Sequence, residues 1–247
     1  MQGRKCSPQG PRAPARPAWC TSNRAPEARA RRNRVCAPPR SLAQPFLSHV
    51  LIPKGFVHDR VSAMAKEMAA EYSGTCPHIL CVLKGASVFA MKLIDQLHAA
   101  FSAHPSAKAG VPFTFAFCRL KSYEGVESTG SVSITGVDST ELRGRRVIVV
   151  EDIVDTGLSM SKLLPVLRGD CGVADARVCT LLEKRTDKSC GLRANYCGFS
   201  IPDAFVVGYG LDYNEAFRDL DHICVVNAAG VAEFREFSPG SPTTADA

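Results

Sequence analysis

Apolar and polar positions follow two different periods along the chain, and each period predicts a different kind of element. Continuous or alternating apolar runs predict buried strands, which are expected at 50–53, 79–83, 113–119, 147–150, 176–182, 205–207 and 223–226. Apolar residues spaced three or four apart predict helices, at 61–72, 89–101 and 160–167. Pro165 should kink or shorten the last of these helices. Strands that alternate with helices indicate an α/β fold with a mainly parallel sheet and right-handed crossovers.

One stretch, residues 147–159, combines a buried strand with polar chemistry. Four apolar β-branched residues lead into Glu151 and Asp152, and Asp155 follows before a Thr156-Gly157 turn. Open α/β sheets bind their ligands at the carboxyl ends of their strands. Small residues at the start of the next helix let backbone N–H groups hold a phosphate at the positive helix end. The stretch therefore suits a sugar phosphate, with carboxylates for the sugar hydroxyls and a turn for the phosphate.

A polar stretch at 121–145 interrupts this pattern. It contains Gly, Ser, Thr, Glu and Asp, with few apolar residues before Val147. A long polar loop in a compact domain is often a lid over a site. Composition alone is equally typical of a lid and of a mobile surface hairpin.

Several motifs resemble those of the type I phosphoribosyltransferases, and most closely the hypoxanthine-guanine branch. The resemblance runs from about Val50 to about Phe234. Its blocks, in the family's order, are Leu83-Lys84-Gly85, residues 119–123, the central stretch 147–159, residues 183–186 and residues 205–220. The resemblance implies the type I phosphoribosyltransferase fold, in which a small hood and a flexible lid loop accompany the sheet and its flanking helices.

The resemblance also implies an enzyme of purine salvage. It would transfer the 5-phosphoribosyl group from phosphoribosyl pyrophosphate to hypoxanthine and guanine, giving IMP or GMP and pyrophosphate. A xanthine-preferring enzyme is an alternative. A non-catalytic sensor of phosphoribosyl pyrophosphate, with a regulatory or RNA-binding role, is another.

The carboxylates would bind ribose and metal. The resemblance assigns the ribose hydroxyls to Glu151 and Asp152, directly or through Mg²⁺, a hard cation that prefers oxygen ligands. Asp212 would be the ligand of a second Mg²⁺. Asp155 would be the catalytic base at the purine N7, although an Asp there could also cap the following helix.

The remaining substrate groups would be bound by four other sets of residues. The 5′-phosphate set comprises Asp155, Thr156, Gly157, Leu158 and Ser159. Lys84, Gly85 and Arg218 would bind pyrophosphate, and the Leu83–Lys84 peptide can be cis in the family. The purine set comprises Lys184, which would donate to O6, Phe205, which would stack on the ring, and the backbone of Val206 and Asp212. Ser122 and Tyr123 would belong to the lid.

Three positions depart from the family's usual residues. Ser159 stands where Thr is usual and keeps the hydroxyl. Leu158 replaces a frequent Lys and removes a positive charge, while Ala86 replaces a frequent Gly and adds a methyl group. We expect these changes to weaken phosphate binding slightly or to restrict the pyrophosphate loop.

Charge and proline divide the chain into three parts. Residues 1–45 hold ten Lys or Arg, one acid and eight of the sixteen prolines, and the net charge of the whole chain is +6. The segment carries +9, which leaves −3 for the rest, so the body does not have the charge of a nucleic-acid-binding surface. We predict a disordered basic leader at 1–45, a phosphoribosyltransferase domain at 46–237 and a disordered tail at 238–247.

The leader also bears on location. It is rich in Arg and poor in acids, as organelle transit peptides are, but it lacks a clean amphipathic helix. There are three alternatives to a transit peptide: a non-targeting extension, a wrongly assigned start codon and a basic arm that touches RNA. The segment also lacks the acidic, aromatic N-terminal residues usual in the family.

Composition supports a cytoplasmic protein. The eleven cysteines are expected to be reduced, because several lie in apolar runs and no zinc-like spacing occurs. No apolar run is long enough to span a membrane. The resemblance further implies a homodimer or homotetramer.

Overall fold

The computed structural model describes residues 44–104, 111–122 and 132–236. Its main feature is a six-stranded sheet. In spatial order the sheet contains β4 (Val132–Thr135), β3 (Thr114–Ser122), β2 (His78–Val82), β5 (Arg146–Val154), β6 (Asp175–Arg185) and β7 (Tyr196–Pro202). All neighbours are parallel except β3 and β4, which are antiparallel. The predicted α/β class and mainly parallel sheet are confirmed.

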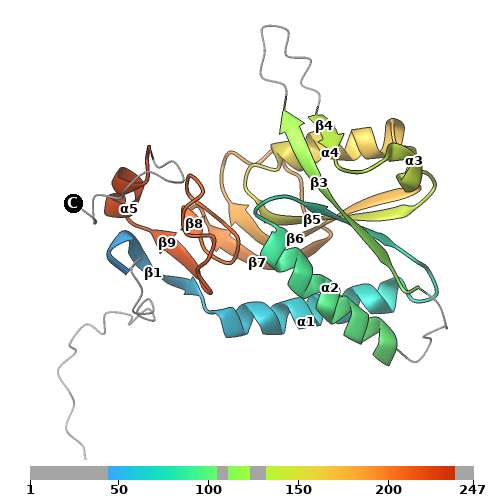
Figure 1. Cartoon of the computed structure of the whole chain (residues 1–247), viewed down its shortest axis with the longest axis horizontal. Coiled ribbons are helices and arrows are strands. Elements are labelled where there is room, and N and C mark those ends of the chain that lie inside the picture. Colours follow the sequence, from blue (N-terminus) through green and yellow to red (C-terminus); the bar gives the residue numbers. More distant parts are fainter. Residues whose placement is uncertain (1–43, 105–110, 123–131, 237–247) are drawn as a thin grey trace, which may run out of the picture. The chain divides into compact units, whose positions relative to one another are not determined.

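Helices cover both faces of this sheet (Figure 1). The helices are α1 (Lys54–Glu71), α2 (Ser87–Ala103), α3 (Ser139–Leu142) and α4 (Leu158–Gly169). Side chains alternate along β5, so that Ile148 and Val150 pack in the core with α1 and α2, whereas Val147 and Val149 pack in the core with α4. A strand buried on both faces explains why β5 reads as a continuous apolar run.

A second, three-stranded antiparallel sheet forms the hood. It contains β1 (Leu47–Ile52), β9 (Ile223–Val226) and β8 (Val206–Val207), with β9 in the middle. A short 3-10 helix, η2 (Gln44–Phe46), and a helix, α5 (Ala228–Glu233), pack against each other beside it. The strands predicted at 205–207 and 223–226 therefore belong to this hood and not to the central sheet.

Two strand predictions need correction. β5 continues past the apolar run to Val154, because its ladder with β6 extends to the pair Val154–Glu183; the carboxylates thus lie within the strand. β7 was not predicted at all. It is an edge strand that contains Gly198, whose α-hydrogen faces the Leu181 carbonyl so closely that a Cβ would lie 2.4 Å from that oxygen.

The polar stretch 121–145 is more ordered than predicted. β3 extends through Ser122, β4 returns beside it, and α3 follows with its N-terminus capped by Asp138. Tyr123 and the rest of 123–131 lie outside the described residues, so the lid prediction is untested there.

Other expectations have separate outcomes. α4 continues past Pro165 to Gly169, so the proline does not end the helix. Among the described residues, Cys81, Cys118, Cys179 and Cys224 are buried, unpaired thiols, as expected. The predicted tail and all but the last residues of the predicted leader lie outside the described part of the chain. Within that part, no helix has the length and apolar character needed to cross a membrane.

Candidate active site

Two carboxylates near the end of β5 form a buried pair. Asp152 is 8% exposed, and its Oδ1 accepts a hydrogen bond from the Ile153 backbone N–H at 2.8 Å. Burial raises the pKa of Glu151 well above its usual value, and the neighbouring Asp152 carboxyl raises it further. Burial also raises the pKa of Asp152, although hydrogen bonds and the charge of Arg218 oppose this rise. Two carboxyls in this setting favour sharing a proton or binding a cation.

One oxygen of this pair has no partner. The Glu151 Oε2 atom is buried and accepts no hydrogen bond from any described residue. A buried polar atom without a partner is costly, and a hard cation or a sugar hydroxyl would satisfy it. Among the described residues, no three His, Cys, Asp or Glu side chains lie close enough together to hold a metal ion. The carboxylate pair with its unpartnered oxygen fits a cation that takes its other ligands from substrate oxygens and water.

The turn after β2 lies directly against Asp152. A Cβ on Gly85 would lie 1.8 Å from the Asp152 Oδ2, so only glycine fits at this position. On its other side, a Cβ on Gly210 would lie 2.4 Å from the Gly85 carbonyl oxygen, and Gly210 has a φ of +96°. The Leu83–Lys84 peptide is cis. Ala86 has a φ of −68°, a conformation open to any residue, so its methyl group strains nothing.

A hairpin-like loop at 208–220 holds Arg218 beside this turn. Backbone hydrogen bonds join Tyr209 N to Leu220 O at 2.7 Å and Gly210 N to Arg218 O at 3.1 Å. The Arg218 guanidinium donates to the Gly210 carbonyl at 2.8 Å and forms an ion pair with Asp212 at 2.9 Å. The predicted pyrophosphate residue and the predicted second metal ligand are thus direct neighbours.

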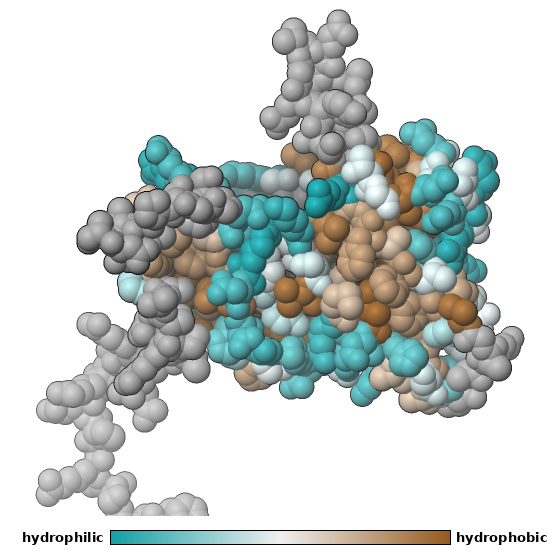
Figure 2. All heavy atoms as spheres, viewed as in Figure 1, coloured by the Kyte–Doolittle hydropathy of each residue, from teal (hydrophilic) through white to brown (hydrophobic). Residues whose placement is uncertain are grey.

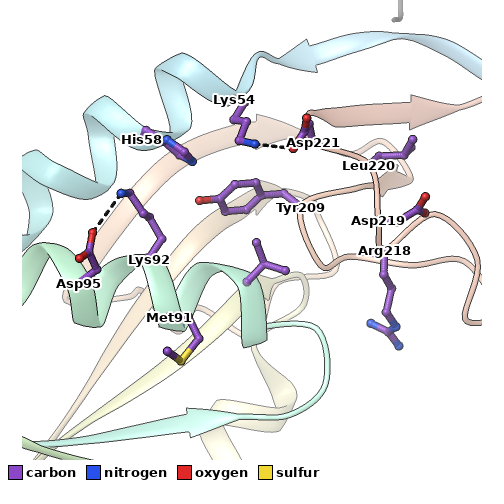
Figure 3. Close-up of a pocket in the computed structure, with 11 residues that line it drawn as sticks. Lys54, His58, Met91, Lys92, Asp95, Tyr209, Arg218, Asp219, Leu220 and Asp221 are labelled. Carbon is purple, nitrogen blue, oxygen red and sulfur yellow. Dashed lines mark hydrogen bonds and ion pairs between the residues drawn. The ribbon is translucent and has the colours of Figure 1, made fainter. Parts of the chain in front are cut away.

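A pocket of about 460 Å³ is lined partly by this loop (Figure 3). The Tyr209 side chain extends into it between α1 and α2, whereas the Arg218 side chain extends away from Tyr209. Two ion pairs, Lys54–Asp221 and Lys92–Asp95, border the pocket. Arg218, Asp219 and Leu220 are among the residues that line this pocket, so it adjoins the loop that carries the predicted pyrophosphate residue.

Lys184, the predicted donor to the purine O6, lies near the end of β6. The Lys184 side chain is 10% exposed, and its Nζ forms an ion pair with the Asp155 Oδ2 at 2.8 Å. Asp203 is a second, more distant partner at 3.8 Å. The base predicted for the purine N7 and the donor predicted for O6 are therefore in contact. Asp155 does not cap α4, because Gly157 is the N-cap residue.

The predicted phosphate turn is supported by the loop that follows β6. Gly157 has a φ of +81°, a conformation that favours glycine. The Cys190 N–H donates to the Thr156 carbonyl at 2.8 Å, and a Cβ on Gly157 would lie 3.0 Å from the Cys190 sulfur. Leu158 is exposed at the first turn of α4. The turn thus opens α4 with free space around its outward residues.

The predicted stacking residue lies on the hood. Phe205 is 47% exposed, and its ring meets the Tyr213 ring edge to face at 5.1 Å between centroids. Val206 follows it in β8 and is buried. A large exposed aromatic ring held by a neighbouring ring is a ready surface for a flat, apolar ligand.

Together, the structure joins the predicted residues into two contacting groups. One contains Gly85, Asp152, Asp212 and Arg218, and the other contains Asp155 and Lys184. Glu151 precedes Asp152 in β5, and the Asp152 carboxyl is near enough to raise the pKa of Glu151. Ser122 lies in β3, and its side chain lies outside the description, as does all of Tyr123.

Two residues that pattern-based reasoning missed belong to this site. Glu215 contacts both Lys84 and Arg218, and Cys190 supports the phosphate turn. Glu215 stands inside the quoted block 205–220, but its role depends on a contact between residues 131 positions apart. No local pattern could have indicated it.

The class of protein follows from comparison with known families. The sequence model of the phosphoribosyl transferase domain matches residues 56–214, which include β2, β5, β6 and the start of the Arg218 loop. The chain belongs to the phosphoribosyl transferase family, and the resemblance stated for its motifs is confirmed.

Particular members of that family are similar over most of the chain. The hypoxanthine-guanine phosphoribosyltransferases of Cricetulus griseus and Homo sapiens are each 42% identical over 190 residues, which is 76% of this chain and 85% of each relative. The corresponding protein of Canis lupus familiaris is 41% identical over the same length. A crystal structure of a hypoxanthine phosphoribosyltransferase from Staphylococcus aureus superposes with a TM-score of 0.66 at 27% identity and covers 81% of this chain and 99% of that one.

Proposed function

We propose that this chain is a purine-salvage enzyme that transfers the 5-phosphoribosyl group from phosphoribosyl pyrophosphate to hypoxanthine or guanine. The products are IMP or GMP and pyrophosphate. The observation that carries the proposal is the contact of Lys184 with Asp155 at 2.8 Å, at the end of the strand that carries Glu151 and Asp152. A hydrogen-bond donor for a purine oxygen and a base for a ring nitrogen thus lie side by side.

In the proposed reaction, the bond from the ribose C1′ to the pyrophosphate oxygen breaks and a bond from C1′ to the purine nitrogen forms. C1′ becomes cation-like as the pyrophosphate leaves with the bonding electrons. No covalent nucleophile is assigned among the proposed site residues, so their contribution is positioning and electrostatic stabilisation. Asp155 accepts or shares the purine proton at N7, and its negative charge stabilises the developing positive ring.

The purine is bound by ring stacking and by hydrogen bonds to its edges. Phe205 offers its exposed ring as a stacking surface, and base–aromatic stacking is worth about 1–3 kcal/mol per base. Lys184 donates to the exocyclic O6, and the backbone of Val206 and Asp212 binds the opposite edge. Adenine has an amino donor at the same position, which would leave two donors facing each other. A mispaired buried donor is strongly disfavoured, so adenine is rejected.

The phosphates occupy the two ends of the site. The turn from Asp155 to Ser159 binds the 5′-phosphate through its backbone N–H groups, and the N-terminus of α4 adds its positive end. Lys84, Gly85 and Arg218 bind the pyrophosphate. Their basic groups neutralise the leaving group as its charge develops.

Magnesium is the proposed cofactor. Glu151 and Asp152 would hold it together with the ribose hydroxyls, and Asp212 would bind a second ion on the pyrophosphate side. When bound, Mg²⁺ supplies positive charge to the leaving pyrophosphate. The unpartnered Glu151 Oε2 and the raised pKa values of the pair support this assignment. A bound cation would favour the ionised form of Glu151 and Asp152, whose protons would pass to solvent.

Self-association is proposed as well, as a dimer or tetramer. Figure 2 shows apolar side chains gathered on the face that β3 crosses. Among the described residues, Met91 of α2 and Phe115 of β3 are 51% and 47% exposed and line one groove of about 450 Å³. Exposed apolar surface of this kind suits a protein contact. Sedimentation velocity of the Phe115→Lys variant tests it, and an unchanged oligomer would place the contact elsewhere.

The location is proposed to be the cytoplasm, with targeting by residues 1–45 as the alternative. Fractionation of cells that express the full chain and a chain lacking residues 1–45 distinguishes them. Organelle enrichment of the full chain alone would favour targeting.

The direct test of the proposed reaction is a purine panel. Purified full-length protein is incubated with phosphoribosyl pyrophosphate, Mg²⁺ and either hypoxanthine, guanine, xanthine or adenine, and nucleotide formation is followed by absorbance. We expect turnover with hypoxanthine and guanine and none with adenine. Absence of nucleotide from both hypoxanthine and guanine would refute the proposal, and a clear preference for xanthine would correct the substrate.

A further inference from the structure

Glu215 holds the two cations that are proposed to bind pyrophosphate. Its Oε2 forms an ion pair with the Lys84 Nζ at 3.0 Å, and its Oε1 forms one with the Arg218 Nη2 at 3.2 Å. Each carboxylate oxygen thus takes one cation. The hydrogen bond from Lys84 is the larger cause that lowers the pKa of Glu215, and the hydrogen bond from Arg218 lowers it further. The side chain is therefore an anion at neutral pH.

The backbone fixes this carboxylate in place. Glu215 has a φ of +69°, which is unfavourable for a residue with a side chain. The Glu215 N–H donates to the Asp212 Oδ2 at 2.7 Å, and paired backbone bonds between Tyr213 and Ala216 close the turn around it. Strained conformations persist where the surrounding structure holds them, often at functional sites.

The position of Glu215 implies competition with the substrate. Lys84 and Arg218 come from two different parts of the chain, and one carboxylate lies between them. Arg218 also keeps its contacts with Asp212 and the Gly210 carbonyl, so its orientation does not depend on Glu215 alone. A polyphosphate that takes both cations must therefore displace Glu215.

We propose that Glu215 is a built-in competitor of pyrophosphate. It stays paired with Lys84 and Arg218 until phosphoribosyl pyrophosphate binds, and it returns to them as the product pyrophosphate leaves. The inference rests on the proposed function, because that function assigns the two cations to pyrophosphate. Product release often limits turnover in enzymes, and a carboxylate that reclaims both cations speeds this step.

A purely structural role for Glu215 predicts the opposite change in pyrophosphate binding. If Glu215 served only to hold Arg218 and Lys84 in the correct place, its removal would weaken pyrophosphate binding. If it competes, its removal strengthens binding. Ion pairs of partly exposed side chains are weak, so competition predicts a modest gain, about three- to tenfold tighter pyrophosphate binding without the charge.

The test is Glu215→Gln, which keeps the size of the side chain and removes its charge. Binding of pyrophosphate in the presence of Mg²⁺ is measured by calorimetry, and product inhibition by steady-state kinetics. We expect about three- to tenfold tighter pyrophosphate binding, a lower KM for phosphoribosyl pyrophosphate and a kcat that does not rise. Glu215→Asp, which cannot reach both cations, should fall between the variant and the unchanged protein.

The matched control is Glu67→Gln. Glu67 is an exposed carboxylate of α1 that pairs with Arg60 at 3.1 Å, remote in sequence from the site, and its substitution should leave pyrophosphate binding unchanged. Thermal melting checks that each variant folds, and Glu215→Ala serves in place of Glu215→Gln if that variant unfolds. Unchanged or weaker binding in the folded variants overturns the inference. Calorimetry measures pyrophosphate binding without turnover, so it tests the role of Glu215 even if the purine panel refutes the proposed reaction.

Discussion

The substitution Gly85→Ala tests the closest approach in the site. A Cβ at this position would lie 1.8 Å from the Asp152 Oδ2 and 2.8 Å from its Cγ, whereas Cβ contacts under 3.0 Å essentially do not occur. Either the Asp152 carboxylate or the turn must therefore move by at least 1.2 Å, which is the difference between 3.0 and 1.8 Å. Both are proposed substrate-binding elements.

The expected effect on activity is large and the effect on stability is moderate. A misplacement of about 1 Å in a catalytic arrangement can cost about 10²-fold in rate, and we expect kcat/KM for phosphoribosyl pyrophosphate to fall by at least that factor. Overpacking costs about 1–3 kcal/mol, which lowers the melting temperature by several degrees for a domain of this size.

The matched control is Gly55→Ala in α1. A Cβ on Gly55 would meet nothing within 4 Å, so the same added methyl group should leave activity unchanged and should stabilise the helix slightly. Steady-state kinetics and thermal melting of both variants complete the test. A folded Gly85→Ala protein with activity within threefold of the unchanged chain would refute the reasoning.

Three further predictions concern single residues. Asp155→Asn should lower kcat by at least about 10²-fold, since general bases contribute about that much, and near-normal turnover in the purine assay would remove the residue from this role. Leu158→Lys should lower the KM for phosphoribosyl pyrophosphate about threefold, because the exposed position accepts a charge; an equal or higher KM would contradict it. Burial, with the charge of Arg145, lowers the pKa of His78 to about 4, so the folded state holds it neutral and stability should fall by up to about 3 kcal/mol as pH drops from 6.5 towards 4. Urea unfolding at several pH values measures this fall, and His78→Gln should reduce it; an identical fall in that variant would rule out His78 as its source.

The central sheet was predictable because burial on both faces leaves a continuous apolar run. β2, β5 and β6 were therefore found near their observed positions. β7 was not, since an edge strand exposes part of its surface and needs no such run. Its outer carbonyls at Cys197 and Gly198 accept hydrogen bonds from Arg60 of α1, a contact across the fold that periodicity does not contain.

The site was predictable where its chemistry lies on one segment, and less so where segments meet. Glu151 and Asp152 lie near the end of a buried strand and Asp155 follows it, and the position of a strand end in an α/β sheet is enough to propose them. The family motifs added Lys184 and Arg218. Contacts that join separate segments depend on packing, so neither the fit of Gly85 against Asp152 nor the bridge made by Glu215 could be derived beforehand.

The order of strands in the hood affects how the protein is made on the ribosome. β1 is among the first segments to emerge, yet its hydrogen-bonding partner is β9, which is translated some 170 residues later. The six-stranded sheet can assemble while β1 is still waiting for that partner, since domains form from the N-terminal end during translation. Phe205, proposed to stack on the purine, and Arg218, proposed to bind pyrophosphate, are also translated late, after β7. A nascent chain that stalls before β9 would therefore contain both β5 carboxylates, yet β1 and β8 would lack the strand that joins them into the hood.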